Sequence, residues 1–118
     1  MKLFDSEWKV MDELWDNGDL SAKELAQRMN LRTGWNKNTT YTVIKKCVDK
    51  GAIERREPNF LCHALLSRRE ARQEEMQALV DRAFDGSAEL LMASLLGREQ
   101  VSQQTLARLR RMIEEEDV

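Results

Sequence analysis

The order of apolar and polar residues predicts three helices in the first half of the chain. Apolar residues recur there at steps of three and four, a spacing that places them on one face of a helix. We expect helices over about residues 6–17, 22–30 and 37–50. Their buried faces are expected to consist of Trp8, Met11, Leu14 and Trp15, of Leu25, Ala26 and Met29, and of Val43, Ile44, Cys47 and Val48.

Residues with capping chemistry stand at the ends of these helices. A side-chain oxygen at a helix start accepts a hydrogen bond from a backbone amide that has no partner within the helix. We expect Asn30 to Gly34 to form a polar turn and Gly51 to end the third helix with a positive φ. The three starts are assigned to Asp5 and Ser6, to the capping box Ser21/Glu24, and to Asn36.

A β-hairpin is predicted directly after the third helix. Residues 52–56 and 60–66 have the composition of two strands, and Glu57-Pro58-Asn59 between them is typical of a turn. Arg55 and Arg56 would then lie near the tip of the hairpin.

The second half of the chain is predicted to be helical. Ser67 and Glu70 form another capping box, which opens a helix over about 68–84, and a nearly all-apolar helix follows at 88–96. Ser102 caps a last helix. The fold class is therefore mainly α with a small β-hairpin, divided near Ser67 into units 1–66 and 67–118.

The segment 67–118 is too short to bury its own apolar residues well. A second copy of the chain is the simplest cover for them, and two-fold dimers are the commonest oligomers. We therefore expect a homodimer. Its interface is assigned to Met76, Leu79, Val80, Phe84, Leu91, Leu95, Leu106, Leu109 and Ile113.

The charge of the chain is unevenly distributed. The net charge is −2, but residues 28–56 hold eight Lys and Arg against two Asp and Glu, a local charge of +6. Such a window predicts a positive patch suited to nucleic acid, or alternatively an ordinary solvated helix face.

The helix at 37–50 carries hydroxyl, amide and ammonium groups where it faces away from the core. Two short helices, a turn and a polar, positive second helix are typical of a helix-turn-helix, and an arginine-tipped hairpin behind it is typical of a wing. Double-stranded DNA is the expected partner. Base contacts are assigned to Asn38, Thr39, Tyr41 and Thr42, and phosphate contacts to Lys37, Lys45, Lys46, Arg55 and Arg56.

Three segments of the chain resemble the BlaI/MecI/CopY family of bacterial repressors. They are Glu7-Trp8-Lys9-Val10-Met11 with Leu14-Trp15, Ser21-Ala-Lys-Glu-Leu25, and Trp35 to Gly51. The resemblance runs from about Phe4 to Ile113. It implies an N-terminal winged helix, a C-terminal three-helix dimerisation segment and repression through an inverted-repeat operator, with Trp35 supporting the start of the recognition helix against the DNA backbone.

The chain also departs from that family. Cys62 and Ala64 stand where the family usually has Tyr and Pro, and Ser87-Ala88 stands near the position of the Asn-Phe bond at which antibiotic-resistance repressors are cleaved. The clustered C-terminal cysteines of the copper-responsive branch are missing. The inducing signal stays open, with an inducer or a sensor protein as a further candidate partner.

Other function classes find little support in the sequence. The chain has no nucleophile motif or phosphate-binding glycine loop, and its acidic residues are expected on exposed helical faces, so we predict no enzyme and no cofactor. Cys47, Cys62 and His63 lack the spacing of a zinc site, and the cysteines are interpreted as buried thiols.

Two alternatives remain beside the DNA-binding interpretation. Cys47 and Cys62 could form a disulfide or a redox switch, and together with His63 they could bind a metal or a small effector as a sensor. The positive face could instead bind an acidic protein. No apolar run is long enough to span a membrane, and the protein is expected in the cytoplasm.

Overall fold

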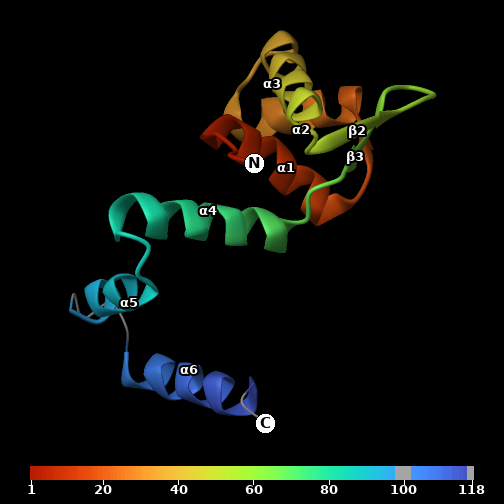
Figure 1. Ribbon diagram of the computed structural model, residues 1–118. Coiled ribbons are helices and arrows are strands. Elements are labelled where there is room, and N and C mark those ends of the chain that lie inside the picture. The colour runs from red at the N-terminus through yellow and green to blue at the C-terminus, as the bar shows by residue number, and fades with distance from the viewer. Residues whose placement is uncertain (98–101, 117–118) are drawn as a thin grey trace. The chain divides into compact units, whose positions relative to one another are not determined.

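The fold is mainly helical with one small antiparallel sheet, as the sequence predicts (Figure 1). The structure is a computed structural model that describes residues 1–97 and 102–116. Within these ranges it contains six helices and three strands. No helix in the described residues is long and apolar enough to cross a membrane.

The chain forms two compact units, Met1–Glu75 and Met76–Val118. The boundary between them lies inside α4 (Arg68–Ala83), and Ala71 in the second turn of this helix belongs to the core of the first unit. The functional division near Ser67 stays a prediction.

The first unit begins with three helices. They are α1 (Asp5–Asn17), α2 (Ala22–Thr33) and α3 (Lys37–Lys50). The prediction of three helices is confirmed, and α3 has the predicted bounds. Their apolar faces meet in one core with the sheet. Its members include Val10, Met11, Leu14, Leu25, Met29, Val43, Ile44, Cys47, Ile53 and Cys62, while Trp8, Trp15 and Val48 are only partly buried.

The prediction for the start of α1 is wrong by one residue. The helix begins at Asp5, so Asp5 and Ser6 lie within its first turn and do not cap it. The backbone N–H of Phe4 instead donates to Oε1 of Glu7 at 2.7 Å.

Helix α2 is longer than predicted. The segment expected to form a polar turn continues the helix to Thr33, whose hydroxyl donates to the carbonyl of Met29 at 2.7 Å. Gly34 then ends α2 with a φ of +76°, and its N–H donates to Asn30 O. The left-handed conformation that glycine tolerates explains why the helix stops here.

The sheet contains a strand that the sequence analysis did not predict. The hairpin strands β2 (Ile53–Arg56) and β3 (Leu61–Ala64) are joined by β1 (Leu20–Ser21), in the order β1-β3-β2. Leu20 pairs with Cys62, so the segment before α2 is fixed to the inner hairpin strand. The hairpin itself and its turn around Pro58 confirm the prediction.

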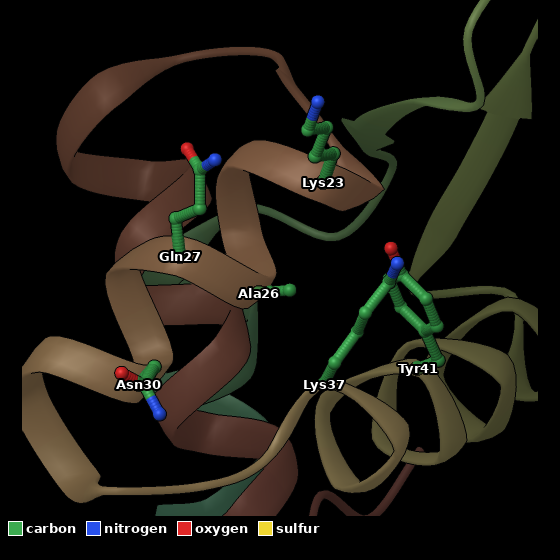
Figure 2. A pocket seen from close by; sticks show the side chains of 6 residues that line it. All are labelled: Lys23, Ala26, Gln27, Asn30, Lys37 and Tyr41. Carbon is green, nitrogen blue, oxygen red and sulfur yellow. The ribbon is translucent and has the colours of Figure 1, made fainter.

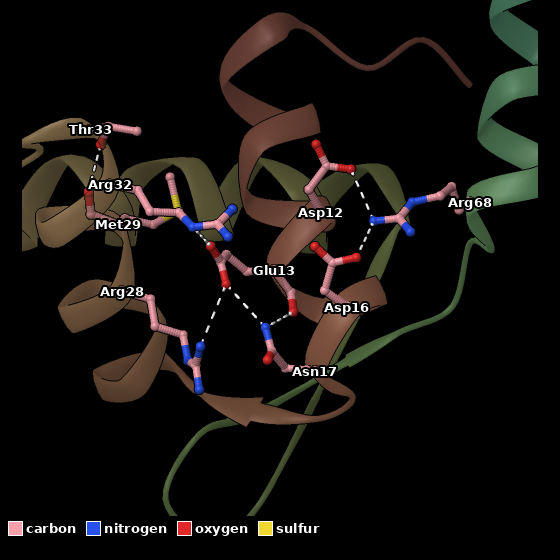
Figure 3. A network of polar contacts seen from close by, with 9 residues as sticks. All are labelled: Asp12, Glu13, Asp16, Asn17, Arg28, Met29, Arg32, Thr33 and Arg68. Atoms are coloured by element: carbon pink, nitrogen blue, oxygen red, sulfur yellow. Dashed lines mark hydrogen bonds and ion pairs between the residues drawn. The ribbon is translucent and has the colours of Figure 1, made fainter.

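Two acidic residues of α1 are buried, which corrects the expectation that carboxylates lie on exposed faces. Glu7 is 0% exposed and Glu13 is 1% exposed. A buried carboxylate requires compensating cations or hydrogen bonds. Glu13 lies among Arg28, Arg32 and Asn17, as Figure 3 shows.

The first turn of α4 is tied to α1. The guanidinium of Arg68 lies 2.7 Å from Asp16 and 3.4 Å from Asp12 (Figure 3), and Trp15 Nε1 donates to Leu66 O at 2.9 Å. The hydrogen bond from Arg68 lowers the pKa of Asp16. These contacts fix where α4 begins on the first unit.

The second unit contains the rest of α4 and the helices α5 (Ala88–Gly97) and α6 (Gln103–Glu116). The predicted caps at the starts of α4 and α6 are present, since the Ser67 hydroxyl accepts from Glu70 N and the Ser102 hydroxyl accepts from Thr105 N, both at 3.1 Å. The acidic residues Glu114, Glu115 and Glu116 belong to α6, and Asp117 lies outside the described residues.

Many apolar side chains of the second unit are exposed in the single chain. Helix α5 has no buried residue. Of the side chains assigned to a dimer interface, Val80 is buried, Phe84, Leu91, Leu106 and Leu109 are half-buried, and Met76, Leu79, Leu95 and Ile113 are exposed.

Candidate nucleic-acid interface

Helix α3 has two chemically different faces. Thr40, Val43, Ile44 and Cys47 are buried against the core. The opposite face presents polar and cationic groups to solvent, with Tyr41 half-buried among them. The exposed members are Lys37, Asn38, Thr39, Thr42, Lys45 and Lys46, all predicted to contact DNA.

The start of α3 is held by local hydrogen bonds. Asn36 Oδ1 accepts from the backbone N–H of Thr39 at 2.8 Å, which confirms the predicted cap. Trp35 is half-buried against the core cluster, and its carbonyl accepts from Asn30 Nδ2 at 3.0 Å. Trp35 thus lies at the junction of α2 and α3, where it supports the start of α3.

The Thr42 hydroxyl already has a partner inside the helix. It donates to the carbonyl of Asn38 at 2.9 Å. What Thr42 offers to solvent is therefore its methyl group and the acceptor capacity of its oxygen.

Three cations that contribute to the local charge of +6 are paired with buried carboxylates. Arg32 lies 2.9 Å and Arg28 3.9 Å from the buried carboxylate of Glu13, and Lys50 lies 2.6 Å from Glu7. Both acidic partners are in α1, outside the charged window. The sequence count therefore overstates the free positive charge of this region.

The two wing arginines are also paired. Arg55 Nε lies 2.7 Å from Glu57 Oε1. Arg56 lies 3.3 Å from Glu54 and 3.9 Å from Asp19. The pairs are exposed, so water screens them and they can open at little cost.

Arg55 has a second partner at the wing tip. Its guanidinium carbon lies 3.9 Å from the centre of the Phe60 ring, within the range of a cation–π contact. The hydrogen bond from Arg55 lowers the pKa of Glu57, which also accepts from Phe60 N at 3.3 Å. Glu57 therefore holds both the wing turn and the arginine that was predicted to contact phosphate.

Within the described residues, three cations of the 28–56 window form no ion pair, namely Lys37, Lys45 and Lys46. All three lie on α3. The free positive charge is therefore concentrated on the helix predicted to enter the major groove.

Lys23 is a further cation with no ion pair among the described residues, and sequence reasoning did not assign it to the site. It lines a hollow of about 330 Å³ between α2 and α3 together with Lys37 and Tyr41 (Figure 2). The sequence signal that could have identified it is a lysine in the first turn of a helix, where the helix dipole disfavours a cation.

The sulfur and imidazole groups do not form a ligand cluster. Cys47 and Cys62 are buried free thiols, as expected, and burial is the main cause that raises their pKa values to about 12 and about 11. His63 Nδ1 lies 2.7 Å from Asp19 Oδ1. Among the described residues, no group of three or more His, Cys, Asp or Glu side chains is placed to hold a metal ion.

Comparison with known proteins supports the resemblance seen in the sequence. MecI, the methicillin resistance regulatory protein of Mammaliicoccus sciuri, is 23% identical over 110 residues, which cover 92% of this chain and 89% of MecI. MecI of Staphylococcus aureus strain N315 gives the same values. An uncharacterized 16.5 kDa protein in the ptsI 3' region of Latilactobacillus sakei is 24% identical over 110 residues, 92% of this chain and 75% of that protein. The family model described as penicillinase repressor matches residues 3–115. The chain therefore belongs to the penicillinase repressor family of transcriptional repressors.

Proposed function

We propose that the chain represses transcription by binding an inverted-repeat DNA operator as a homodimer, with α3 of each protomer in a major groove. The observation that carries this proposal is the division of α3 into a buried face and a polar face rich in free lysines. A helix anchored in this way has one side available for a groove about as wide as a helix.

The polar face offers two kinds of contact. Lys37, Lys45 and Lys46 can neutralise phosphates and release counterions, which supplies affinity without sequence information. Selectivity would come from base edges, where Asn38 can bind adenine and a threonine methyl can pack on a thymine methyl. Since the Thr42 hydroxyl donates to Asn38 O, Thr42 is expected to read bases through its methyl group.

The exposed apolar side chains of the second unit support a dimer. Met76 is 53%, Leu90 50% and Ile113 64% exposed in the single chain. Burying these side chains against a second copy would stabilise the dimer, because each Å² of apolar surface removed from water contributes about 25 cal/mol of free energy. A two-fold dimer would present two α3 helices to half-sites about one helical turn apart, or a multiple of that distance.

Fluorescence anisotropy with a labelled duplex from upstream of the chain's own gene tests the proposal. The wild-type chain is expected to bind this duplex at least about tenfold more tightly than a shuffled duplex. Replacing Lys45 and Lys46 by Gln should weaken binding to both duplexes, while the matched change of the exposed Arg69 and Arg72 in α4 should not.

Two results would contradict the proposal. One is equal binding to both duplexes that does not respond to the Lys45 and Lys46 changes. The other is a chain that stays monomeric in sedimentation at the concentrations where it binds. Failure to bind any duplex would favour the alternative that this face docks an acidic protein.

A further inference from the structure

A hollow lies between α2 and α3 on the first unit, beside the polar face of α3. It has a volume of about 330 Å³. Figure 2 shows the α2 side chains on one side of it and the α3 side chains on the other. Its lining consists of Lys23, Ala26, Gln27 and Asn30 from α2 and of Lys37 and Tyr41 from α3.

A second hollow continues from the first toward the wing. It has a volume of about 340 Å³ and shares Lys23 and Tyr41 with the first hollow. Its other lining residues are Ala22 at the start of α2 and Asn59 and Phe60 at the wing turn. The two hollows therefore form a path from the α2–α3 junction to the wing.

The charge along this path is positive, and its one aromatic partner among the lining residues is Tyr41, whose ring centre lies 5.6 Å from Lys37 Nζ. No carboxylate lines either hollow. Among the described residues, neither Lys23 nor Lys37 forms an ion pair, although most other cations of the region do. Two lysines facing the same hollow repel each other unless an anion lies between them.

Both lysines lie in the first turn of their helices. Lys37 is the first residue of α3 and Lys23 the second residue of α2. A helix dipole places positive potential at the N-terminal turn, so both lysines add charge where the dipole already disfavours it. The same potential attracts an anion, and the two helix starts would act on it together.

We infer that this hollow binds a phosphate group of the DNA backbone, with Lys23 as a phosphate contact beside Lys37. The Tyr41 phenol can donate to the same phosphate group. The DNA strand would continue over the second hollow toward Phe60 and the wing. This inference rests on the proposed function, because it assigns a residue of α2 to the same DNA-binding surface.

The test uses the full chain and random-sequence duplex DNA, with the affinity measured over a series of NaCl concentrations. Each phosphate contact contributes about 0.9 to the slope of log affinity against log salt. Lys23→Gln should therefore reduce the steepness by about one unit and weaken binding to all duplexes alike. Lys2→Gln, at an exposed lysine far from α2 in the sequence, is the matched control and should keep the wild-type slope.

Folding and a free anion are tested separately. Lys23 is exposed, and its removal from the first turn of α2 should leave the circular dichroism unchanged and the melting temperature equal or higher. Pyrophosphate is titrated into the wild-type chain without DNA and followed by the NMR shifts of the Lys37 and Tyr41 amides.

The outcomes are distinct. An unchanged salt slope for Lys23→Gln overturns the inference while leaving the proposed function standing. The same unchanged slope together with pyrophosphate binding would assign the hollow to a free phosphorylated ligand instead. A wild-type chain that binds no duplex at all overturns the proposed function, and the inference with it.

Discussion

The buried carboxylate of Glu7 lies 2.6 Å from the ammonium of Lys50 and joins the first turn of α1 to the last residue of α3. Oε1 of Glu7 also accepts from Phe4 N, and Lys50 Nζ donates to Lys2 O at 2.8 Å. The end of α3 is thus held to the N-terminal segment by an ion pair whose carboxylate is fully buried.

Replacing Glu7 by Gln should lower the free energy of unfolding by about 3 kcal/mol, because a buried charge pair that loses one partner leaves the other uncompensated. Urea unfolding followed by tryptophan fluorescence measures this, since Trp8, Trp15 and Trp35 all lie in the first unit. Asp5→Asn, at an exposed carboxylate of the same helix, is the control. Equal midpoints for the two variants would show that the Glu7–Lys50 pair does not stabilise the fold.

Thr40 has a buried hydroxyl whose removal should stabilise the fold, in contrast to the removal of the Glu7 charge. Its side chain is 0% exposed, and its hydroxyl has no hydrogen-bond partner in the described part of the chain. An unsatisfied buried hydroxyl costs about 1–3 kcal/mol. Thr40→Val should therefore raise the free energy of unfolding by about 1 kcal/mol and leave DNA affinity unchanged. A destabilised Val variant would mean that the hydroxyl is satisfied, for example by a bound water.

Much of the fold follows from local sequence signals, and the exceptions have identifiable causes. The bounds of α3 are set by Asn36 and Gly51, whose effects act within one turn. Helix α2 extends beyond its apolar pattern because the Thr33 hydroxyl donates to the Met29 carbonyl and the helix ends only at Gly34. A strand as short as β1 has no periodicity to detect, so only its pairing with β3 defines it.

Some features of the candidate site could be predicted from neighbouring residues in the sequence, and others depend on residues that are far apart in it. The polar outer face of α3 follows from helical spacing alone. The ion pairs could not be predicted from helical spacing. Glu7 and Lys50 lie 43 positions apart, and Glu13 of α1 pairs with two arginines of α2. Lys23 was missed because its place beside Lys37 depends on the packing of α2 against α3.

The wing carboxylate Glu57 should restrain the DNA affinity of Arg55. Glu57→Gln keeps an acceptor for Phe60 N but removes the charge that pairs with Arg55. The variant should bind random-sequence DNA about twofold to fivefold more tightly, the range expected for opening an exposed pair. Glu75→Gln in α4 is the control. Unchanged affinity in the Glu57 variant would indicate that Arg55 does not reach DNA.

The two thiols should make stability fall at alkaline pH. Unfolded thiols ionise near pH 8.5, whereas burial raises the pKa of Cys62 to about 11 and that of Cys47 to about 12. The contribution of the two thiols to the free energy of unfolding is therefore complete below about pH 8.5, and it decreases as the pH rises toward 11 and 12. Comparing urea unfolding of the wild type and Cys62→Ala between pH 8 and pH 10 isolates the effect, and the variant should lose less stability. A loss of equal size would mean that Cys62 is ionised in the folded chain.

In the proposed function, two copies of the chain place their α3 helices on a symmetric operator. A nuclease footprint of the full chain on the region upstream of its own gene tests this most directly. We expect one protected segment made of two inverted half-sites, whose centres lie about one helical turn or a multiple of it apart. Protection that spreads evenly along the DNA, or no protection at concentrations where the chain is dimeric, would contradict it.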